Sequence, residues 1–316
     1  MKALITGIAG FTASHLADVL LKQGLEVSGI DLAGSRLDNL LHIKNKIKLY
    51  SCDIGDAAGL AKVFKKVKPD FIFHLAAQSV PYESWARPVQ SLSINILGTV
   101  NVLEAVRSLK LNSRVHLACS AEGYGLVKPG QIPVREEQLF LPLSPYAVGK
   151  AGQDLLGFQY FKSYGMFIVR TRAFNHIGPR MNQRFAASNF ARQIALIEKG
   201  KQEPVILVGS LDPVRDFTDA RDVAIAYWLS LKKGKAGEAY NVCSGKGYKM
   251  KALLDILLSF SKEKIKVKTD KARLRPSDVL MLVGDHTRIS KTTGWRPRIS
   301  FEQSLKDILN YWRERV

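Results

Sequence analysis

The feature that most constrains the fold of this chain is a regular alternation of apolar and amphipathic segments over its first two thirds. The apolar segments have the length of buried strands, and stretches with apolar residues at helical spacing follow them. We predict strands at 2–6, 26–31, 47–52, 71–75, 114–119 and 166–170, and helices at 11–23, 57–67, 89–109 and 146–164. Strands that alternate with helices in this way form a parallel sheet with helices on both faces.

The rhythm of the sequence changes after about residue 172. Segments become less regular, and Pro, Gly and Arg gather in possible binding loops. Because the chain contains no Ser/Gly-rich linker, we expect the second region to pack against the first. We predict an α/β protein with a Rossmann-like, doubly wound parallel sheet, formed by residues 1–174 and about 214–243. Residues 175–213 and 244–316 are expected to form a smaller, mixed α/β C-terminal lobe that binds the substrate.

The composition argues against several classes of protein. Hydrophobic residues make up 46% of the 316 residues, as in a soluble globular protein, and no uninterrupted apolar stretch is long enough to cross a bilayer. The start of the chain lacks the cleavage site of a signal peptide, so we expect a cytoplasmic protein without a membrane partner. The three cysteines, Cys52, Cys119 and Cys243, lie far apart and predict neither a disulfide framework nor a metal site.

The net charge of +19 is large, but the lysines and arginines are spread along the whole chain. The sequence contains no recognition helix, zinc finger or aromatic RNA-binding signature. We therefore interpret these lysines and arginines as solvent-exposed surface residues and expect no nucleic-acid partner. A positive field would still favour a substrate that carries phosphate.

A glycine-rich turn, Gly7-Ile8-Ala9-Gly10, lies between the first predicted strand and the first predicted helix, which opens with Phe11 and Thr12. Glycines at such a turn let the backbone approach a pyrophosphate, whose charge is favourable at the helix N-terminus. The turn therefore predicts a dinucleotide site.

Asp31 ends the second predicted strand, where a carboxylate accepts hydrogen bonds from an adenosine ribose and repels a 2′-phosphate. We therefore predict NAD(P)(H) as cofactor, with NAD(H) favoured over NADP(H). Ser35 and Arg36 follow closely and could still receive a phosphate. Asp53 and Ile54, after the third strand, either frame the adenine or belong to a solvated loop.

Tyr146 and Lys150 lie four residues apart at the start of the last predicted helix of the sheet region, so they share one helix face. A tyrosine ionises at about pH 10 and needs a nearby charge to serve as an acid or base near neutrality. We expect the ammonium of Lys150 to lower the pKa of the Tyr146 phenol. Together with Ser120 and the glycine-rich turn, this pair indicates hydride chemistry at a sugar or alcohol carbon.

These motifs together resemble the extended short-chain dehydrogenases/reductases, which act on nucleotide sugars. The resemblance covers almost the whole chain and depends on the order and spacing of its motifs. The strings are Thr6-Gly7-x-x-Gly10, His74-Leu75-Ala76-Ala77, Asn95 with Gly98-Thr99, Ser120-x-x-x-Tyr124-Gly125, Ser144-Pro145-Tyr146-x-x-x-Lys150, Arg172-x-Phe174-Asn175-x-x-Gly178-Pro179 and Arg215-Asp216-Phe217-x-x-x-Arg221-Asp222-Val223.

The resemblance implies a role for each of the central residues. Tyr146 is the catalytic acid/base, Lys150 also holds the nicotinamide ribose hydroxyls, and Ser120 binds the substrate oxygen. His74 is structural. The residues that line the cofactor groove include Leu75, Ala76, Ala77 and Gln78, in addition to those of the glycine-rich turn.

Glu122 leaves the reaction open between two relatives. Ser120-Ala121-Glu122 is similar to the Thr-x-Glu of GDP-mannose 4,6-dehydratases, whose glutamate helps to remove water across C5 and C6. GDP-6-deoxy-4-keto-mannose reductases also tend to keep a glutamate here, and the strings around Asn175, Arg215 and Asn241 resemble these reductases more. We favour reduction of GDP-4-keto-6-deoxy-D-mannose to GDP-D-rhamnose over dehydration. A nucleotide-sugar 4-epimerase and a catalytically silent binding module are the further alternatives.

The resemblance also implies a GDP-sugar site and a homodimer. Arg215 and Arg275 resemble the family's diphosphate and ribose clamps, and the planar fork of an arginine suits a phosphate. Asn175 is expected to hold the sugar or a phosphate oxygen. The remaining candidates for the substrate site are Arg180, Asn189, Arg192 and Asp278. Subunits of the family often pair through two long helices, for which 89–109 and 146–164 are the candidates.

Overall fold

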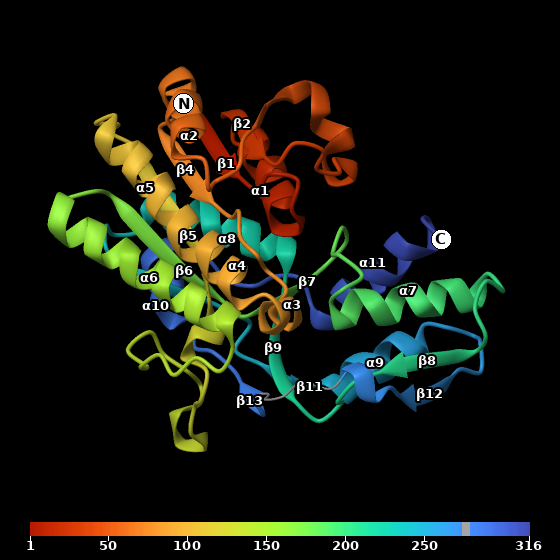
Figure 1. The fold of residues 1–316 in the computed structure, drawn as a ribbon. Helices are drawn as coiled ribbons and strands as arrows, with labels where there is room; N and C mark the ends of the chain where they lie inside the picture. Colours follow the sequence, from red (N-terminus) through yellow and green to blue (C-terminus); the bar gives the residue numbers. More distant parts are fainter. Residues whose placement is uncertain (274–278) are drawn as a thin grey trace.

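The computed structural model of the protein describes residues 1–273 and 279–316. Its centre is a seven-stranded sheet, in which every neighbouring pair of strands runs parallel (Figure 1). In spatial order the strands are β10 (Ala239–Val242), β6 (Ile168–Ala173), β5 (Arg114–Ser120), β4 (Phe71–His74), β1 (Lys2–Thr6), β2 (Glu26–Asp31) and β3 (Ile47–Ser51). The predicted doubly wound sheet is confirmed. The strand order reverses between β1 and β4, and ligands bind at such a reversal point in folds of this kind.

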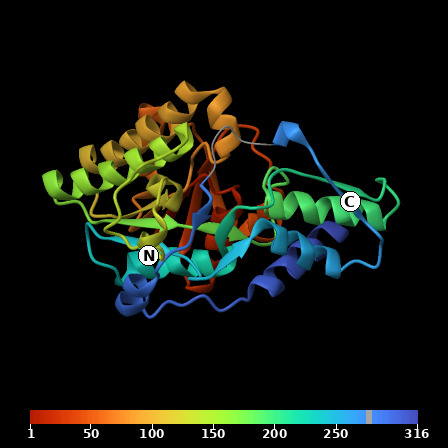
Figure 2. The same ribbon diagram turned by 90° about the horizontal axis from the view of Figure 1, so that it is seen from below.

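Helices cover both faces of this sheet (Figure 2). Side chains along β1 alternate between the two faces: Ala3 and Ile5 pack in one hydrophobic cluster with α1 (Phe11–Lys22) and α8 (Ala220–Lys233). Leu4 packs in another cluster with α2 (Ala57–Val67) and α5 (Gly98–Ser108). All three side chains are fully buried. Burial on both faces explains why the central strands consist of continuous apolar runs in the sequence.

The helix predicted at 89–109 is one helical segment, but its middle turn is wound differently. A π-helical turn, η2 (Ser93–Leu97), joins α4 (Pro88–Leu92) to α5. The buried Asn95 in this turn accepts a hydrogen bond from the Gln78 backbone N–H at 2.8 Å and donates one to the Gln78 carbonyl at 3.1 Å. The neighbouring α6 (Pro145–Tyr164) approaches closely, because a Cβ at Gly149 would lie 2.9 Å from the Asn95 Cβ. Such turns often occur at functional sites, and this one fixes the loop that follows β4.

The segment Pro88–Ser108 is also the one helix, among the residues that the structure describes, with the length and composition to cross a membrane. Its most apolar window is 44% buried inside the protein, and α4 and α5 contact α6. Core helices of soluble proteins share this length and composition, so these properties by themselves do not indicate a membrane span.

The strand predicted at 166–170 begins later and extends further, as β6. Its polar C-terminal half is buried because Arg170 and Arg172 both form ion pairs with Asp154 of α6. The Arg172 Nε atom lies 2.8 Å from Asp154 Oδ2. A sequence pattern does not reveal that Asp154 pairs with these arginines. Arg170 and Arg172 therefore read as polar residues that end the strand.

The C-terminal region forms the predicted smaller lobe of mixed α/β structure. One small sheet consists of β7 (Asn175–Ile177), β9 (Val214–Asp219), β11 (Gly247–Lys249) and β13 (Met281–Leu282), and another of β8 (Val205–Val208) and β12 (Lys266–Thr269). A separate hydrophobic cluster lies among α7 (Ala186–Glu198), α9 (Met250–Ser259) and α11 (Phe301–Arg313). Of the segment 214–243, α8 packs on α1 and β10 joins the main sheet, whereas β9 pairs within the smaller lobe.

Short helices complete the described chain. They are η1 (Asp38–Lys46), α3 (Pro81–Ala86), η3 (Ala121–Tyr124), η4 (Pro129–Gln131), η5 (Lys271–Arg273) and α10 (Thr287–Thr293).

Two histidines are buried in the interior of the main sheet. His74 Nδ1 lies 2.8 Å from Thr6 Oγ1, and its Nε2 lies 3.1 Å from Thr99 Oγ1. His116 Nε2 lies 2.8 Å from Thr171 Oγ1. Burial lowers the pKa of each histidine from 6.5 to about 3. Both rings are therefore neutral at physiological pH and act as parts of the core.

We expect these histidines to make the fold sensitive to mild acid. Between pH 7 and pH 5 the unfolded state takes up protons on both histidines and the native state does not, so stability falls. The free energy of unfolding should fall by on the order of 2 kcal/mol per histidine over this range. Urea unfolding at the two pH values measures the loss of stability. His116→Gln should remove the part of this loss that comes from one histidine. The matched control is His42→Gln at the surface; an equal loss of pH dependence in both variants would contradict the prediction.

Candidate active site

A cavity of about 1380 Å³ lies between the main sheet and the smaller lobe. Residues that follow β1, β2, β4 and β5 line it from one side, and residues of β7, α7 and β9 line it from the other. Pockets that bind a single drug-sized ligand measure roughly 300–1,000 Å³. The cavity is therefore large enough for two ligands side by side, such as a dinucleotide and a nucleotide sugar.

The glycine-rich turn forms the wall of the cavity at the start of α1. Gly7 has a positive φ of 71°, and a Cβ there would lie 2.8 Å from the Ala76 Cα. Gly10 caps α1 and carries no side chain that could occupy the N–H groups of the first turn. Phe11 and Thr12 follow along the same wall. Free N–H groups at a helix N-terminus and a close-lying backbone are the features that a pyrophosphate site requires.

Asp31 lies at the end of β2 on the same side of the cavity. Its carboxylate accepts hydrogen bonds from the Ala9 N–H at 2.8 Å, the Leu32 N–H at 2.9 Å and the Ser35 hydroxyl at 2.7 Å. These three bonds fix the orientation of the carboxylate at the wall of the cavity. Arg36 lies at the exposed rim and pairs with Asp38 at 2.7 Å. The other predicted cofactor residues, Asp53, Ile54, Leu75, Ala76, Ala77 and Gln78, also line the cavity.

Ser120, Tyr146 and Lys150 meet where β5 ends and α6 begins. Ser144 caps α6 by accepting a hydrogen bond from the Ala147 N–H at 3.1 Å. This cap places Tyr146 in the first helical turn, where its hydroxyl lies close enough to the Ser120 side chain for the serine to favour the phenolate. The Lys150 Nζ atom, one turn later, donates to the Ala118 carbonyl at 2.7 Å. The three side chains therefore converge on the cavity that the glycine-rich turn also lines.

Burial has the largest effect on the pKa of Tyr146 and on that of Lys150. It raises the pKa of Tyr146 to about 12, against the effect of the Ser120 hydrogen bond, and the nearby Glu122 charge raises it further. Burial also lowers the pKa of Lys150 from 10.5 to about 8. The pKa of Tyr146 is thus raised and not lowered as we expected, because the unfavourable loss of hydration of the phenolate outweighs the effects that favour it. At neutral pH Tyr146 holds a proton that it can donate, and Lys150 is mostly charged.

The predicted substrate residues divide into three groups. Asn175, Asn189, Arg192 and Arg215 line the cavity on the side of the smaller lobe. Arg180 lies elsewhere: its guanidinium forms an ion pair with Asp18 of α1 at 2.8 Å. Arg275 and Asp278 lie outside the described residues.

Several cavity residues escaped the sequence analysis. His176 of β7 stacks on Phe11, with ring centroids 5.9 Å apart, and Arg273 donates to the Asn189 side chain at 2.9 Å. Arg184, before α7, forms an ion pair with Glu83 of α3 at 2.7 Å and so joins the two lobes. His176 follows directly on the predicted Asn175, and this proximity was the signal available in the sequence.

Metal-binding side chains do not gather in the described part of the chain: it holds no group of three or more His, Cys, Asp or Glu residues able to bind an ion. Four side chains that line the cavity carry groups able to hydrogen-bond or to exchange a proton: Ser120, Glu122, Tyr146 and Lys150.

Comparisons with known proteins agree with this geometry. The family described as GDP-mannose 4,6 dehydratase matches residues 4–308. The GDP-6-deoxy-D-mannose reductase of Pseudomonas aeruginosa is 34% identical over 100% of this chain and 98% of its own. The GDP-mannose 4,6-dehydratase of Vibrio cholerae is 32% identical over 97% and 92%. A solved structure of RMD from Pseudomonas aeruginosa, complexed with NADPH, has a TM-score of 0.86 and 32% identity over 100% of this chain and 99% of its own. The chain therefore belongs to the GDP-mannose 4,6-dehydratase family of NAD(P)-dependent extended short-chain dehydrogenases/reductases.

Proposed function

We propose that this protein reduces the C4 keto group of GDP-4-keto-6-deoxy-D-mannose to give GDP-D-rhamnose, with NAD(P)H as reductant. The observation that carries the proposal is the Tyr146 phenol, which burial keeps protonated beside Ser120 in a cavity large enough for both ligands. A reduction needs such a proton donor, because the carbonyl oxygen becomes an alkoxide as its carbon is reduced. The full-length similarity to a GDP-6-deoxy-D-mannose reductase supports the substrate.

Each side chain of the site has a separate role in this proposed reduction. NAD(P)H held against Gly7, Gly10 and Asp31 would supply a hydride to the keto carbon. Ser120 orients the keto oxygen by a hydrogen bond, and Tyr146 gives its proton to that oxygen. Lys150 contributes a positive charge beside the phenol, which stabilises the phenolate left behind. Arg215 and Asn175, on the opposite wall, are suited to hold the diphosphate and the sugar.

The direct test supplies the purified protein with the keto sugar and reduced nicotinamide. We expect loss of nicotinamide absorbance equal to the keto sugar consumed, and a product that has gained two hydrogens. Because the Asp31 carboxylate repels a 2′-phosphate, we expect a higher kcat/KM with NADH than with NADPH. A protein that leaves the keto sugar unchanged with either cofactor contradicts the proposal.

Dehydration of GDP-mannose is the second candidate, since Glu122 lines the cavity and lies near enough to Tyr146 to raise its pKa. A carboxylate in this place is able to move the protons that dehydration requires. We expect Glu122→Gln to leave reduction of the keto sugar largely unchanged. If the protein is a dehydratase, the same substitution lowers conversion of GDP-mannose by about 10²-fold or more. Mass analysis of the products from both substrates separates the two outcomes, and an epimerase would instead return an isomer of its substrate.

We also infer that the protein acts in the cytoplasm as a homodimer. Apolar side chains are exposed along the two long helical segments that the family uses for pairing. They are Val89 and Leu97 on one segment, and Val148, Leu155 and Phe158 on α6. A second copy that covers this face would remove these side chains from water, which favours association by roughly 25 cal/mol per Å² of apolar surface.

A further inference from the structure

The catalytic-site lysine has a second hydrogen-bond acceptor that no motif assigns. Lys150 Nζ donates to the Gln153 Oε1 atom at 2.9 Å, in addition to the Ala118 carbonyl at 2.7 Å. Gln153 lies three residues further along α6, on the same face as Lys150. Two of the three N–H groups of the ammonium are thus directed to fixed oxygen atoms of the protein. The side chain nevertheless lines the cavity, so the third N–H group is left for it.

Gln153 is almost completely buried, with 1% of its surface exposed. Burying an amide is unfavourable unless its polar atoms are paired. The oxygen of this amide is paired with the Lys150 ammonium, and a hydrogen bond to a charged group is stronger than one between neutral groups. The polar side chain at position 153 therefore acts on Lys150 and does more than fill space.

The surroundings of Lys150 leave its charge without a carboxylate in direct contact, within residues 1–273 and 279–316. On its own helix Tyr146 is protonated, and Asp154 is bound to Arg170 and Arg172 of β6. The titratable groups of other elements that interact with Lys150 are His74 of β4, Cys119 and His116 of β5, and His176 of β7. Glu122 of η3 and Tyr227 of α8 interact with the neighbouring Tyr146.

These facing groups are mostly neutral near pH 7. Burial lowers the pKa of each of the three histidines and raises the pKa of the Cys119 thiol and the Tyr227 phenol. The charge of Glu122 raises the pKa of Tyr146, and Glu122 is not among the groups that shift the pKa of Lys150. The two carbonyl oxygens therefore orient the ammonium without cancelling its charge.

We propose that Gln153 is a positioning residue, whose neutral carbonyl holds the Lys150 ammonium toward the cavity and preserves its charge for the cofactor ribose and Tyr146. The inference rests on the proposed function where it concerns turnover, and on the family's NAD(P) dependence where it concerns binding. Two substitutions at this position have opposite expected effects, which packing alone does not explain.

The sign of each effect follows from the charged form of Lys150. In Gln153→Met the ammonium loses an acceptor, so the charged form is disfavoured and the pKa of Lys150 falls. In Gln153→Glu a carboxylate replaces the carbonyl, so the charged form is favoured and the pKa of Lys150 rises. The wild-type lysine, whose pKa burial brings to about 8, lies between the two variants.

The experiment measures NADH binding by its fluorescence between pH 6 and pH 10, with no sugar present. We expect affinity to fall at high pH as Lys150 loses its proton. The midpoint of this fall should move by about one pH unit or more to lower pH in Gln153→Met, and by a similar amount to higher pH in Gln153→Glu. The matched controls are Gln23→Met and Gln23→Glu, which change an exposed glutamine at the end of α1.

The pH profile of kcat/KM for the keto sugar should show the same pair of opposite shifts. Midpoints that stay fixed, or that move in the same direction in both variants, overturn the proposal. If Gln153→Met does not fold, Gln153→Asn retains a shorter amide and should move the midpoint in the same direction by less. Failure of the proposed function has a different signature, because the wild-type protein would then bind NADH with this pH dependence and leave the keto sugar unchanged.

Discussion

Tyr146→Phe lowers kcat for reduction of the keto sugar by about 10³-fold and leaves NADH binding close to that of the wild type. The Tyr146 side chain is half-buried, so phenylalanine keeps the packing of the ring and removes only the hydroxyl beside Ser120. General acid catalysis by a positioned side chain contributes about 10²–10⁴-fold, and this substitution removes it. Because the proton is transferred in the transition state, kcat and kcat/KM should fall together while KM changes little.

Steady-state kinetics with saturating NADH measures this effect. The matched control is Tyr164→Phe, which removes an exposed hydroxyl from the other end of α6. Fluorescence titration with NADH shows whether the cofactor site is intact. Turnover that survives in Tyr146→Phe would mean that another group supplies the proton, and the catalytic assignment would fail.

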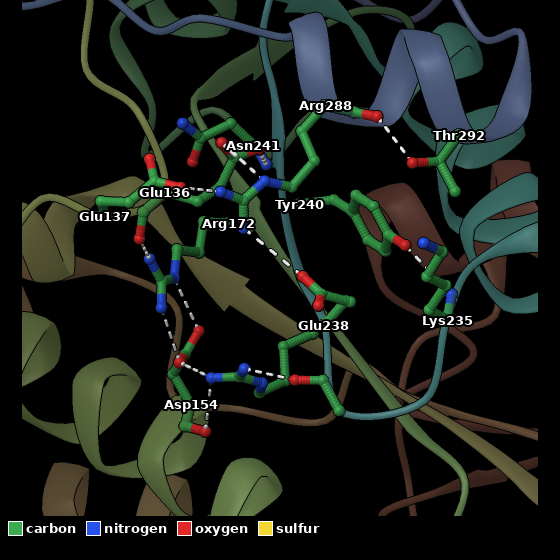
Figure 3. A network of polar contacts seen from close by, with 12 residues as sticks. Glu136, Glu137, Asp154, Arg172, Lys235, Glu238, Tyr240, Asn241, Arg288 and Thr292 are labelled. Carbon is green, nitrogen blue, oxygen red and sulfur yellow. Dashed lines mark hydrogen bonds and ion pairs between the residues drawn. The ribbon is translucent and has the colours of Figure 1, made fainter.

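Asp154→Ala lowers the free energy of unfolding by about 3–5 kcal/mol, which is a large part of the stability of most domains. The Asp154 carboxylate is buried and binds two arginines, and its Oδ1 atom accepts from Arg172 at 2.9 Å (Figure 3). Arg172 also donates to the Tyr124 hydroxyl at 3.0 Å and to the Glu136 carbonyl at 2.7 Å. The substitution leaves two buried guanidinium groups without their anion. The resulting loss of stability exceeds the net stabilisation that the ion pairs contribute.

Urea unfolding followed by circular dichroism measures the loss. Asp255→Ala is the matched control, because Asp255 pairs with Lys251 on the exposed surface of α9. Its loss should be below about 0.5 kcal/mol. Similar losses in the two variants would show that burial does not strengthen the dependence of the fold on Asp154.

Much of the fold was predictable because the pattern depends on neighbours in the sequence. Apolar strands separated by amphipathic helices determine a parallel sheet, and the turn at Gly7 marks its first crossover. The partner of Arg180 was not predictable in this way. Its backbone has a positive φ of 72°, and Asp18 comes from a helix that lies far away in the sequence.

The candidate site also combines features that the sequence predicts with features that depend on the folded chain. The sequence predicts that three side chains lie together, from the spacing of Tyr146 and Lys150 and from the end of β5 at Ser120. The pKa of Tyr146 depends on how much water the folded chain excludes, which the sequence does not encode locally. The same holds for the π turn at Asn95, which requires the close approach of α6 at Gly149.

The strand order of the main sheet has a consequence for synthesis on the ribosome. Strands β1 to β6 emerge in one uninterrupted series, whereas the edge strand β10 emerges only after β7, α7, β8, β9 and α8. Chains grow at about 5–20 residues per second, and N-terminal parts generally fold first. The nascent chain is therefore able to form the wall around the glycine-rich turn early. The outer edge of β6 stays unpaired until β10 has been synthesised. Translation pauses between residues 173 and 239 would prolong the time for which that edge is open to aggregation.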